Sequence, residues 1–273
     1  MLDQSANFVW NMLYKLEQRI FDLRFGVATA GTSQTRWDVS SVGGTNFWYQ
    51  GAQWPAVSFA LRDLKPTSSD VFVDLGSGKG KALLMAARLP YRRVVGVEID
   101  GELVESAQDN LARGRRHSRA GSVEMEVADI LDWPIPDDAT TIFMFNPFFG
   151  ETFHAALQKV FDSYDRNPRD LHVVYGFPWE HDWLVGTGRV VVESVRPYTL
   201  PPRRRWWERG EVIIIYHVTG AAEPSDSVHC PLRPRRGAGE AMRRWREPNG
   251  HSFGNPLRGR GDAVPVQAEP GPV

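Results

Sequence analysis

A short segment starting at Asp74 has the residue types and spacing of a ligand-binding turn. Asp74 is followed by Gly76, Gly78 and Gly80, and glycines lack the Cβ atom that would keep a bound molecule away from the backbone. The apolar run Val71–Val73 before the turn is typical of a buried strand, and the pattern after it is typical of a helix. Such a strand, turn and helix start would gather unpaired backbone N–H groups at one point. We therefore expect a ligand with a carboxylate or phosphate group there.

Polar residues stand at the ends of three further predicted strands. Glu98, Asp129 and Asn146 each close a run of β-branched or apolar residues. Ligands of open α/β sheets bind at the carboxyl ends of the strands, and a carboxylate at the place of Glu98 can accept hydrogen bonds from two ribose hydroxyls. Asp100 is the second candidate for that role, although it is better suited to capping the next helix.

The spacing of the glycines separates this turn from two other nucleotide-binding motifs. Neither GxGxxG nor GxxxxGK[ST] is present at this turn. Instead, Asp74 and the three glycines match (D/E)xGxGxG, and here the sequence resembles the class I S-adenosylmethionine-dependent methyltransferases. The resemblance covers roughly residues 50–220. It implies S-adenosyl-L-methionine as cofactor and methyl transfer as the activity, whereas a plain tight turn is the alternative interpretation.

The resemblance also implies roles for individual residues around the cofactor. In that family an acid at the position of Glu98 holds the ribose, and an acid at the position of Asp129 accepts from the adenine amino group. The following backbone N–H, here that of Ile130, meets the adenine ring. The aromatic segment before the glycine turn often forms part of a lid in the family, so Tyr49 and Gln53 are candidates to touch the ligand or to fill a groove beside the sheet.

The fourth predicted strand ends in a second, partial motif. Family members that methylate exocyclic or amide nitrogens often carry (D/N/S)PP(Y/F) at this place, and the chain has Asn146, Pro147 and Phe148. The resemblance thus implies that Asn146 faces the substrate or the cofactor, with nitrogen as one candidate acceptor atom. A strand-terminating turn is the alternative.

These arguments give one set of predicted site residues. The predicted cofactor-binding residues are Tyr49, Gln53, Asp74, Gly76, Ser77, Gly78, Gly80, Glu98, Asp129, Ile130 and Asn146, and Asn146 is also the predicted catalytic residue. No general base is identified. We predict no metal site, because His172, His181 and His217 lack the sequence spacing of metal ligands.

The order of the predicted elements indicates an α/β fold. Strands are expected at 71–73, 93–99, 122–130, 141–145 and 171–177, and helices at 55–64, 101–116 and 151–164. Two long strands, 189–195 and 212–218, then follow with no predicted helix between them, so they pair antiparallel or lie apart. The methyltransferase sheet ends in such a hairpin. The predicted fold class is therefore a Rossmann-like α/β methyltransferase fold, with a seven-stranded mixed sheet, an antiparallel terminal hairpin and helices on both faces.

Three segments make up the predicted domain organisation. Residues 1–48 form an N-terminal helical extension and loop, residues 49–220 the cofactor-binding domain, and residues 221–273 a Pro/Gly/Arg-rich tail that we expect to be disordered. Apolar residues recur at helical spacing over residues 7–25, which predicts a helix that packs on the domain or on a second copy of the chain. The run of three arginines and two tryptophans at residues 203–207 could contact nucleic acid or form a solvated loop.

The composition restricts the partners and the compartment. The 273 residues carry a formal net charge of −1, so no overall field attracts nucleic acid or anionic lipid. Cys230 is the single cysteine, which excludes an internal disulfide and fits a reducing compartment. Without a signal-peptide pattern or a long apolar run, we expect a soluble cytoplasmic protein.

The expected partner is an unidentified methyl acceptor. A small molecule or a protein fits the neutral charge better than a nucleic acid. A different nucleotide-using enzyme, such as an oxidoreductase, and a non-catalytic cofactor-binding module both stay open as alternatives.

Overall fold

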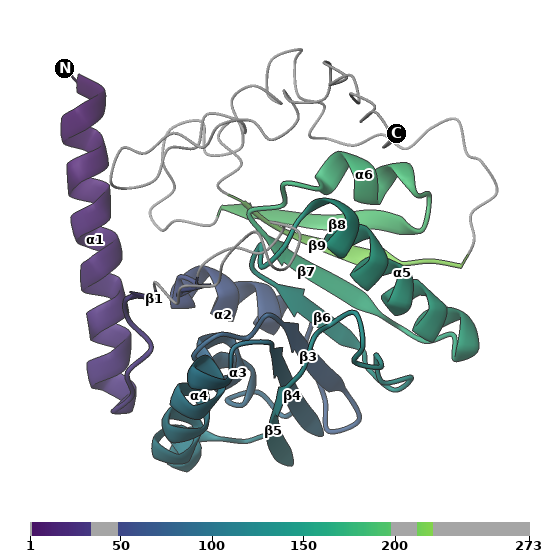
Figure 1. Cartoon of the computed structure of the whole chain (residues 1–273), viewed down its shortest axis with the longest axis horizontal. Helices are drawn as coiled ribbons and strands as arrows, with labels where there is room; N and C mark the ends of the chain where they lie inside the picture. The colour runs from purple at the N-terminus through teal and green to yellow at the C-terminus, as the bar shows by residue number, and fades with distance from the viewer. Residues whose placement is uncertain (1, 34–48, 198–211, 221–273) are drawn as a thin grey trace, which may run out of the picture.

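A computed structural model describes residues 2–33, 49–197 and 212–220 of the chain (Figure 1). The helices are α1 (Leu2–Phe25), α2 (Trp54–Asp63), α3 (Lys81–Ala86), α4 (Gly101–Gly114), the 3-10 turn η1 (Arg115–His117), α5 (Gly150–Arg166) and α6 (His181–Gly186). The strands are β1 (Thr32–Ser33), β2 (Tyr49–Gln50), β3 (Val71–Leu75), β4 (Arg93–Glu98), β5 (Ser122–Val127), β6 (Thr141–Met144), β7 (His172–Gly176), β8 (Val190–Pro197) and β9 (Val212–Val218). The predictions for the arginine–tryptophan run at 203–207 and for the tail at 221–273 lie outside the described residues.

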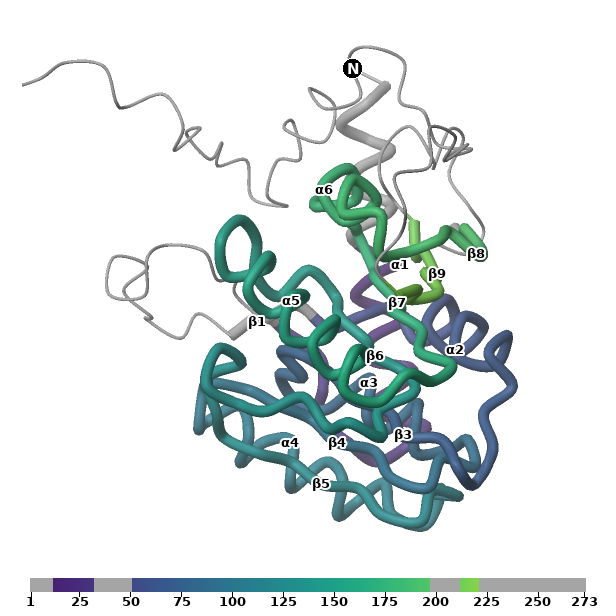
Figure 2. The backbone as a smooth tube through the Cα atoms, turned by 90° about the vertical axis from the view of Figure 1, so that its right-hand side faces the viewer, coloured from purple at the N-terminus to yellow at the C-terminus, as the bar shows by residue number. Residues whose placement is uncertain are grey.

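Seven strands form one mixed sheet in the order β5-β4-β3-β6-β7-β9-β8. The five strands from β5 to β7 are parallel, whereas β9 is antiparallel to both of its neighbours, β7 and β8. Figure 2 shows the edge strands β5 and β8 at opposite ends of the sheet. The predicted seven-stranded mixed sheet with its antiparallel terminal hairpin is confirmed.

One helix was not predicted from the sequence. Between β7 and β8 the chain forms α6, a helix of six residues. It has fewer than two helical turns, which is too short for a recognisable apolar periodicity. The hairpin itself is unaffected, because β8 and β9 pair directly beyond this helix.

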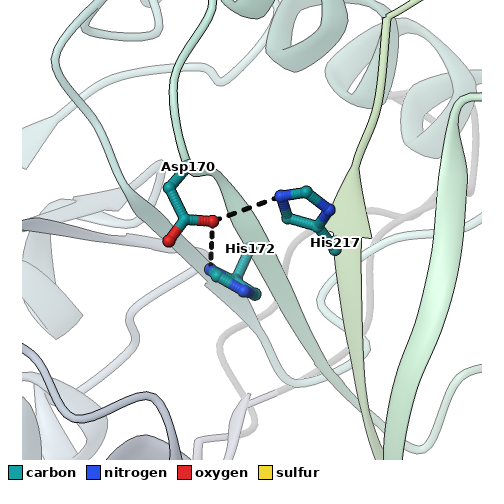
Figure 3. A group of neighbouring side chains, drawn as sticks. All are labelled: Asp170, His172 and His217. Atoms are coloured by element: carbon teal, nitrogen blue, oxygen red, sulfur yellow. Dashed lines mark ion pairs between the residues drawn. The ribbon is translucent and has the colours of Figure 1, made fainter.

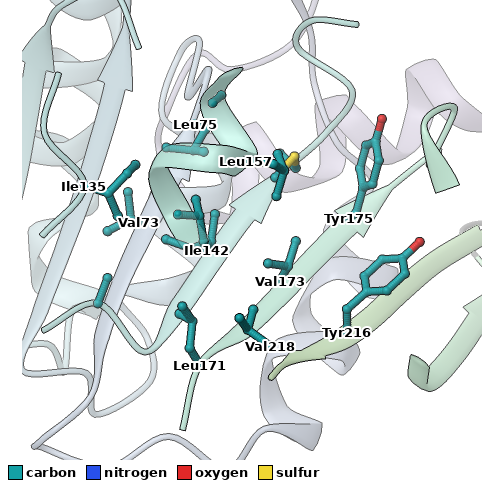
Figure 4. Close-up of a cluster of buried hydrophobic side chains, with 14 of the residues drawn as sticks. Val73, Leu75, Ile135, Ile142, Leu157, Leu171, Val173, Tyr175, Tyr216 and Val218 are labelled. Carbon is teal, nitrogen blue, oxygen red and sulfur yellow. The ribbon is translucent and has the colours of Figure 1, made fainter. Parts of the chain in front are cut away.

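The core lies in two layers, one on each face of the sheet. Side chains of a strand alternate between the faces, so Val71, Val73 and Leu75 pack on the side of α5, whereas Phe72 packs on the side of α2 and α3. Figure 4 shows Val73 and Ile142 in the layer that α5 covers. Helices therefore cover both faces of the sheet, as predicted.

The C-terminal half of α1 packs on the domain near the glycine turn. Phe21 and Phe25 are buried against the layer that contains α2 and α3. The Tyr14 hydroxyl donates to the Gly51 carbonyl at 2.6 Å, and Nε2 of Gln18 donates to the same oxygen at 3.2 Å. The predicted helix is thus confirmed, and it docks on its own domain.

The outer face of α1 carries large apolar side chains that stay exposed. They are Met12, Leu13, Leu16, Ile20 and Leu23. A homo-oligomer formed through this helix remains a prediction, as do the predicted domain boundaries. The short strands β1 and β2 pair across the boundary at 48/49, with Thr32 opposite Gln50. In the described part of the chain, no helix is both long and apolar enough to cross a membrane.

Candidate active site

The glycine turn between β3 and α3 adopts a backbone that requires glycine. Gly76, Gly78 and Gly80 have φ angles of +81°, +51° and +76°. A Cβ atom on Gly76 would lie 2.4 Å from Cβ of Pro147, which follows β6. The turn is therefore pressed against the end of the neighbouring strand, and the missing side chain is what allows this close approach.

The backbone N–H groups of this turn are paired within the protein. Those of Gly76 and Ser77 donate to the Val97 carbonyl at 2.9 and 3.0 Å, and that of Gly80 donates to Ser77 at 2.9 Å. The N–H of Gly78 donates to Oε2 of Glu98 at 2.9 Å. The prediction that this turn offers unpaired N–H groups to an anionic ligand is wrong for these four residues, because the adjoining end of β4 supplies acceptors for three of them.

Glu98, at the end of β4, is held in place by three backbone donors. Besides the N–H of Gly78, its carboxylate accepts those of Ile99 at 2.9 Å and Asp100 at 3.1 Å. Burial raises the pKa of Glu98, and the three N–H donors oppose that rise. A carboxylate offers about four acceptor positions, so acceptor capacity for a ligand remains. Asp100 caps α4 instead, with Oδ1 accepting from the N–H of Glu102 at 2.9 Å, as the capping interpretation expected.

Asp74 is a buried carboxylate that faces the same region. It is 2% exposed, and burial, together with the charge of Glu98, holds its pKa well above the usual range. Within the described ranges no hydrogen-bond donor is paired with its carboxylate. Two carboxylates of like charge thus lie near one another, and a cationic ligand between them would relieve their repulsion.

Asp129 and Ile130 form the third side of the site, after β5. The Ala128 N–H donates to the Glu98 carbonyl at 3.0 Å, which ties this segment to the end of β4. Oδ1 of Asp129 accepts the Leu131 N–H at 2.8 Å in a local turn, and Ile130 is buried. The turn fixes the direction of the Asp129 side chain at the sheet edge.

Asn146, after β6, has a strained backbone and a fixed side chain. Its φ angle is +48°, a conformation that non-glycine residues seldom adopt and that concentrates at functional sites. The Tyr175 hydroxyl donates to its Oδ1 at 3.1 Å. Because Tyr175 is fully buried on β7, it holds the amide at the edge of the sheet.

One cavity joins most of the predicted site residues. Its lining includes Asp74, Gly76, Ser77, Gly78, Glu98, Asp129, Ile130 and Asn146. Gln53 and Gly80 do not line it: Gln53 precedes α2, and the backbone of Gly80 packs near Ala107 of α4. For Tyr49 the structure describes the backbone pairing in β2 but not the side chain, so its predicted ligand contact stays a prediction.

The cavity also contains residues that the sequence prediction missed. Its lining includes Lys81 of α3 and a set of aromatic residues, namely Phe143, Phe145, Phe148, Phe177 and Trp179. The rings of Phe145 and Phe177 meet edge to face, with centroids 5.6 Å apart. Phe177 directly follows β7. Its position at the carboxyl end of a parallel strand, where open α/β sheets bind ligands, is the signal in the sequence that points to it.

The charges around the cavity favour a cationic ligand at the glycine turn. Asp74, Glu98 and Asp129 line it, and Lys81 is the single basic residue among the described lining residues. The Nζ atom of Lys81 is already engaged by α1, at 2.7 Å from Oε1 of Gln18 and 3.4 Å from Oε1 of Glu17. A pyrophosphate would meet the carboxylates unshielded, whereas a sulfonium or ammonium group would be attracted to them.

A family model described as a methyltransferase domain matches residues 72–167 of the chain. The matched segment runs from the second residue of β3 to the residue after α5. It contains the glycine turn and all the predicted site residues except Tyr49 and Gln53.

Several solved structures are similar to this chain. An RNA methyltransferase from Salinibacter ruber in complex with S-adenosyl-L-homocysteine shares 20% identity over 63% of this chain and 96% of its own, with a TM-score of 0.42. A TehB-like SAM-dependent methyltransferase from Corynebacterium glutamicum shares 16% over 67% and 94%, with a TM-score of 0.43. A ribosomal protein L11 methylase from Lactobacillus delbrueckii subsp. bulgaricus shares 14% over 63% and 81%, with a TM-score of 0.46. These similarities are too low to indicate an acceptor. Among curated proteins no match to the chain is found.

Proposed function

We propose that this chain, whose residues 72–167 match a methyltransferase-domain model, is an S-adenosylmethionine-dependent methyltransferase and that it methylates a small acceptor molecule with an aromatic or other apolar group. The observation that carries the proposal is one cavity whose lining includes the carboxylates Asp74, Glu98 and Asp129 together with Asn146 and five aromatic side chains. We propose that the acidic residues bind the cofactor and that the aromatic residues near Asn146 bind the acceptor.

The residues at the glycine turn fit S-adenosyl-L-methionine. The cofactor carries a sulfonium and an ammonium group, and both would lie in the field of Asp74 and Glu98; the charge of Glu98 contributes to the raised pKa of Asp74. We propose that Glu98 accepts hydrogen bonds from the ribose hydroxyls. Asp129 would accept from the adenine amino group, and Ile130 would pack against the ring.

When bound, the cofactor supplies an activated methyl group on its sulfonium. The protein then has to align the acceptor with the methyl carbon and exclude water. We propose that Asn146 holds the acceptor, because its strained backbone and its hydrogen bond from Tyr175 fix the amide at the cavity wall. An acceptor that donates a hydrogen bond, such as an amine, would use the second lone pair of Oδ1.

The aromatic residues beside Asn146 support an apolar acceptor. Phe145, Phe177 and Trp179 line this part of the cavity. Aromatic walls bind planar or apolar groups through burial and ring contacts. The same walls also suit a cationic amine, whose charge is attracted to ring faces.

Cofactor preference tests the proposal first. The full chain is titrated in a calorimeter with S-adenosyl-L-homocysteine and, separately, with NADH. Only S-adenosyl-L-homocysteine should show saturable binding. Preference for NADH would instead favour an oxidoreductase, the alternative that the acidic cavity argues against.

Acceptor choice is tested with methyl-labelled cofactor. The chain is incubated with a panel of aromatic amines, phenols and aliphatic amines, with a small protein panel and with RNA, and label transfer is counted. Turnover confined to small aromatic or apolar acceptors supports the proposal, and turnover on protein or RNA alone overturns it. Cofactor binding without any turnover favours a non-catalytic binding module.

A further inference from the structure

Three titratable side chains meet at the end of the sheet remote from the cavity. His172 is the first residue of β7, Asp170 lies two residues before it, and His217 lies near the end of β9. His172 and His217 are partners in the antiparallel register. The sequence separates them by more than forty residues, which is why no ligand spacing was visible there.

The strand pairing brings the two imidazoles close together. The Val218 N–H donates to the Leu171 carbonyl at 2.8 Å, so that pair is hydrogen-bonded and the adjoining pair, His172 and His217, is not. In antiparallel sheets, side chains of non-hydrogen-bonded pairs lie closest to one another. The two ring centroids are 5.2 Å apart.

Both imidazoles face the same carboxylate (Figure 3). Oδ1 of Asp170 lies 3.2 Å from Nε2 of His217 and 3.7 Å from Nδ1 of His172. One ligand atom from each of the three residues lies within 4.8 Å of the other two, and across the described ranges no other group of three such residues does so. Donor atoms this close together can share one ion.

A fourth side chain determines which nitrogen of His172 is available. Oε2 of Glu193 lies 3.0 Å from Nε2 of His172. Glu193 sits at an irregularity in β8, where the register with β9 shifts between Val192 and Ser194, and such bulges redirect side chains. A carboxylate that accepts a hydrogen bond from Nε2–H keeps the proton on Nε2 and leaves the lone pair on Nδ1, the nitrogen that faces Asp170. This carboxylate–histidine arrangement is the usual outer support of a metal-binding histidine.

We propose that Asp170, His172 and His217 bind a late first-row divalent cation, with Zn²⁺ as the first candidate, and that Glu193 orients His172. Two imidazoles and one carboxylate are ligands that Zn²⁺ favours, whereas Mg²⁺ and Ca²⁺ prefer oxygen ligands alone. The site is open on one side, because Asp170 is 80% exposed and His217 is 42% exposed, so water completes the coordination.

The position of the site indicates a structural role rather than a catalytic one. The cavity lies at the carboxyl ends of the parallel strands, whereas His172 begins its strand. The ion would join β7 to β9, the strand that reverses the direction of the sheet. Since it binds the folded chain, it should raise the melting temperature.

Calorimetric titration with ZnCl₂ tests the proposal directly on the untagged full-length chain, after dialysis against a chelator. One equivalent of Zn²⁺ should bind to the wild type. Glu193→Gln should weaken binding by about 10–100-fold, the usual effect of removing an outer carboxylate. His172→Ala and His217→Ala should each weaken it further, because each removes a ligand.

Two controls separate this site from other histidines. His117→Ala changes an imidazole far from the cluster along the chain, and it should bind Zn²⁺ as the wild type does. A variant with His229, Cys230 and His251 replaced removes the histidine and cysteine ligands beyond residue 220, and it should also retain the site. Zn²⁺ should raise the melting temperature of both controls but not that of His217→Ala.

A folding check and a Co²⁺ spectrum complete the test of the metal site. Circular dichroism and thermal unfolding of each variant report whether it folds, and His217→Ala is expected to disturb the fold less than His172→Ala because His217 is more exposed. Replacement of Zn²⁺ by Co²⁺ should give the intense visible bands of a four-coordinate ion in the wild type only. The proposal is overturned if the wild type shows no saturable binding, or if His172→Ala and His217→Ala bind as the wild type does.

Discussion

Lys81 and Glu17 form an ion pair, with Nζ and Oε1 3.4 Å apart, that joins the first residue of α3 to helix α1. The Lys81 side chain is 2% exposed, and its Nζ also lies 4.6 Å from the centroid of the Phe21 ring. The Trp54 N–H donates to the same oxygen of Glu17 at 2.9 Å. One residue of the cavity wall thus depends on a helix that precedes residues 72–167, the segment that matches the family model, so α1 is part of the support of the site.

Lys81 should make stability depend on pH in the alkaline range. Burial lowers the pKa of Lys81 from 10.5 to about 8, although Glu17 opposes the shift. Between these values the unfolded chain binds a proton that the folded chain does not, so the free energy of unfolding should rise with pH, by up to about 3 kcal/mol. Urea denaturation from pH 7 to pH 10 measures this rise relative to Lys81→Met, which has no such proton. Parallel curves for the two proteins would contradict the prediction.

Gly76→Ala should destabilise the chain by roughly 1–3 kcal/mol, the usual range for a strained backbone. The φ angle of +81° is unfavourable for alanine, and the new methyl group would clash with Pro147. Gly101→Ala is the matched control, because a Cβ atom there meets open space at the start of α4. Urea denaturation should give a lower free energy of unfolding for Gly76→Ala than for Gly101→Ala. Equal stabilities would show that the turn does not need its close approach to β6.

Asp74→Asn should stabilise the cofactor-free protein while weakening cofactor binding. Burial and the charge of Glu98 raise the pKa of Asp74, so the wild type loses stability as the pH rises above about 4, the usual value for this side chain. The neutral amide does not titrate. The stability advantage of the variant should therefore grow from pH 4 toward neutral pH. Asp132→Asn, at an exposed neighbouring acid, is the control and should change neither quantity.

Glu98→Ala should weaken the binding of S-adenosyl-L-homocysteine by roughly 1–3 kcal/mol, because hydrogen bonds to a charged acceptor are lost. It should also destabilise the fold, since the N–H groups of Gly78, Ile99 and Asp100 lose their acceptor. Calorimetry measures the affinity, and thermal unfolding measures the stability. Glu105→Ala, an exposed position on α4, should leave the affinity unchanged. If Glu98→Ala bound the ligand as tightly as the wild type, its assignment to the ribose would be wrong.

Asn146→Ala should abolish turnover of the best acceptor with little effect on the binding of S-adenosyl-L-homocysteine. The amide is proposed to hold the acceptor rather than the cofactor. Tyr175→Phe removes only the hydroxyl that orients Oδ1, so it should lower kcat by less than Asn146→Ala does. Label transfer and calorimetry on the same preparations test both statements. A large loss of ligand affinity in Asn146→Ala would move this residue to the cofactor part of the site.

The sequence predicted the sheet and the common location of Asp74, Glu98 and Asp129 along one cavity, because both follow from local signals. Asp74, Glu98 and Asp129 each stand at the end of an apolar run, and the order of those runs determines which edge of the sheet they share. Local signals could not show that the backbone N–H groups of the glycine turn are paired within the protein. Their acceptors, Val97 and Glu98, lie on the next strand, and only the register of β3 and β4 brings them within reach.

The other features that the sequence did not predict also depend on contacts between segments that are distant in the chain. Lys81 of α3 is held in the cavity wall by Gln18 of α1, which lies more than sixty residues earlier in the chain. Asp170, His172 and His217 meet because β9 is antiparallel to β7. Neither contact leaves a spacing pattern in the sequence.

The position of β9 between β7 and β8 has a consequence for biosynthesis. As the chain leaves the ribosome, β8 emerges before the strand that it must pair with. Until Val218 has been translated, β7 presents an open edge, and β8 has no neighbour in the sheet. Until that point chaperones should be needed to protect the open edge of the nascent chain. The seven-stranded sheet should be completed only in the final stage of translation of this domain.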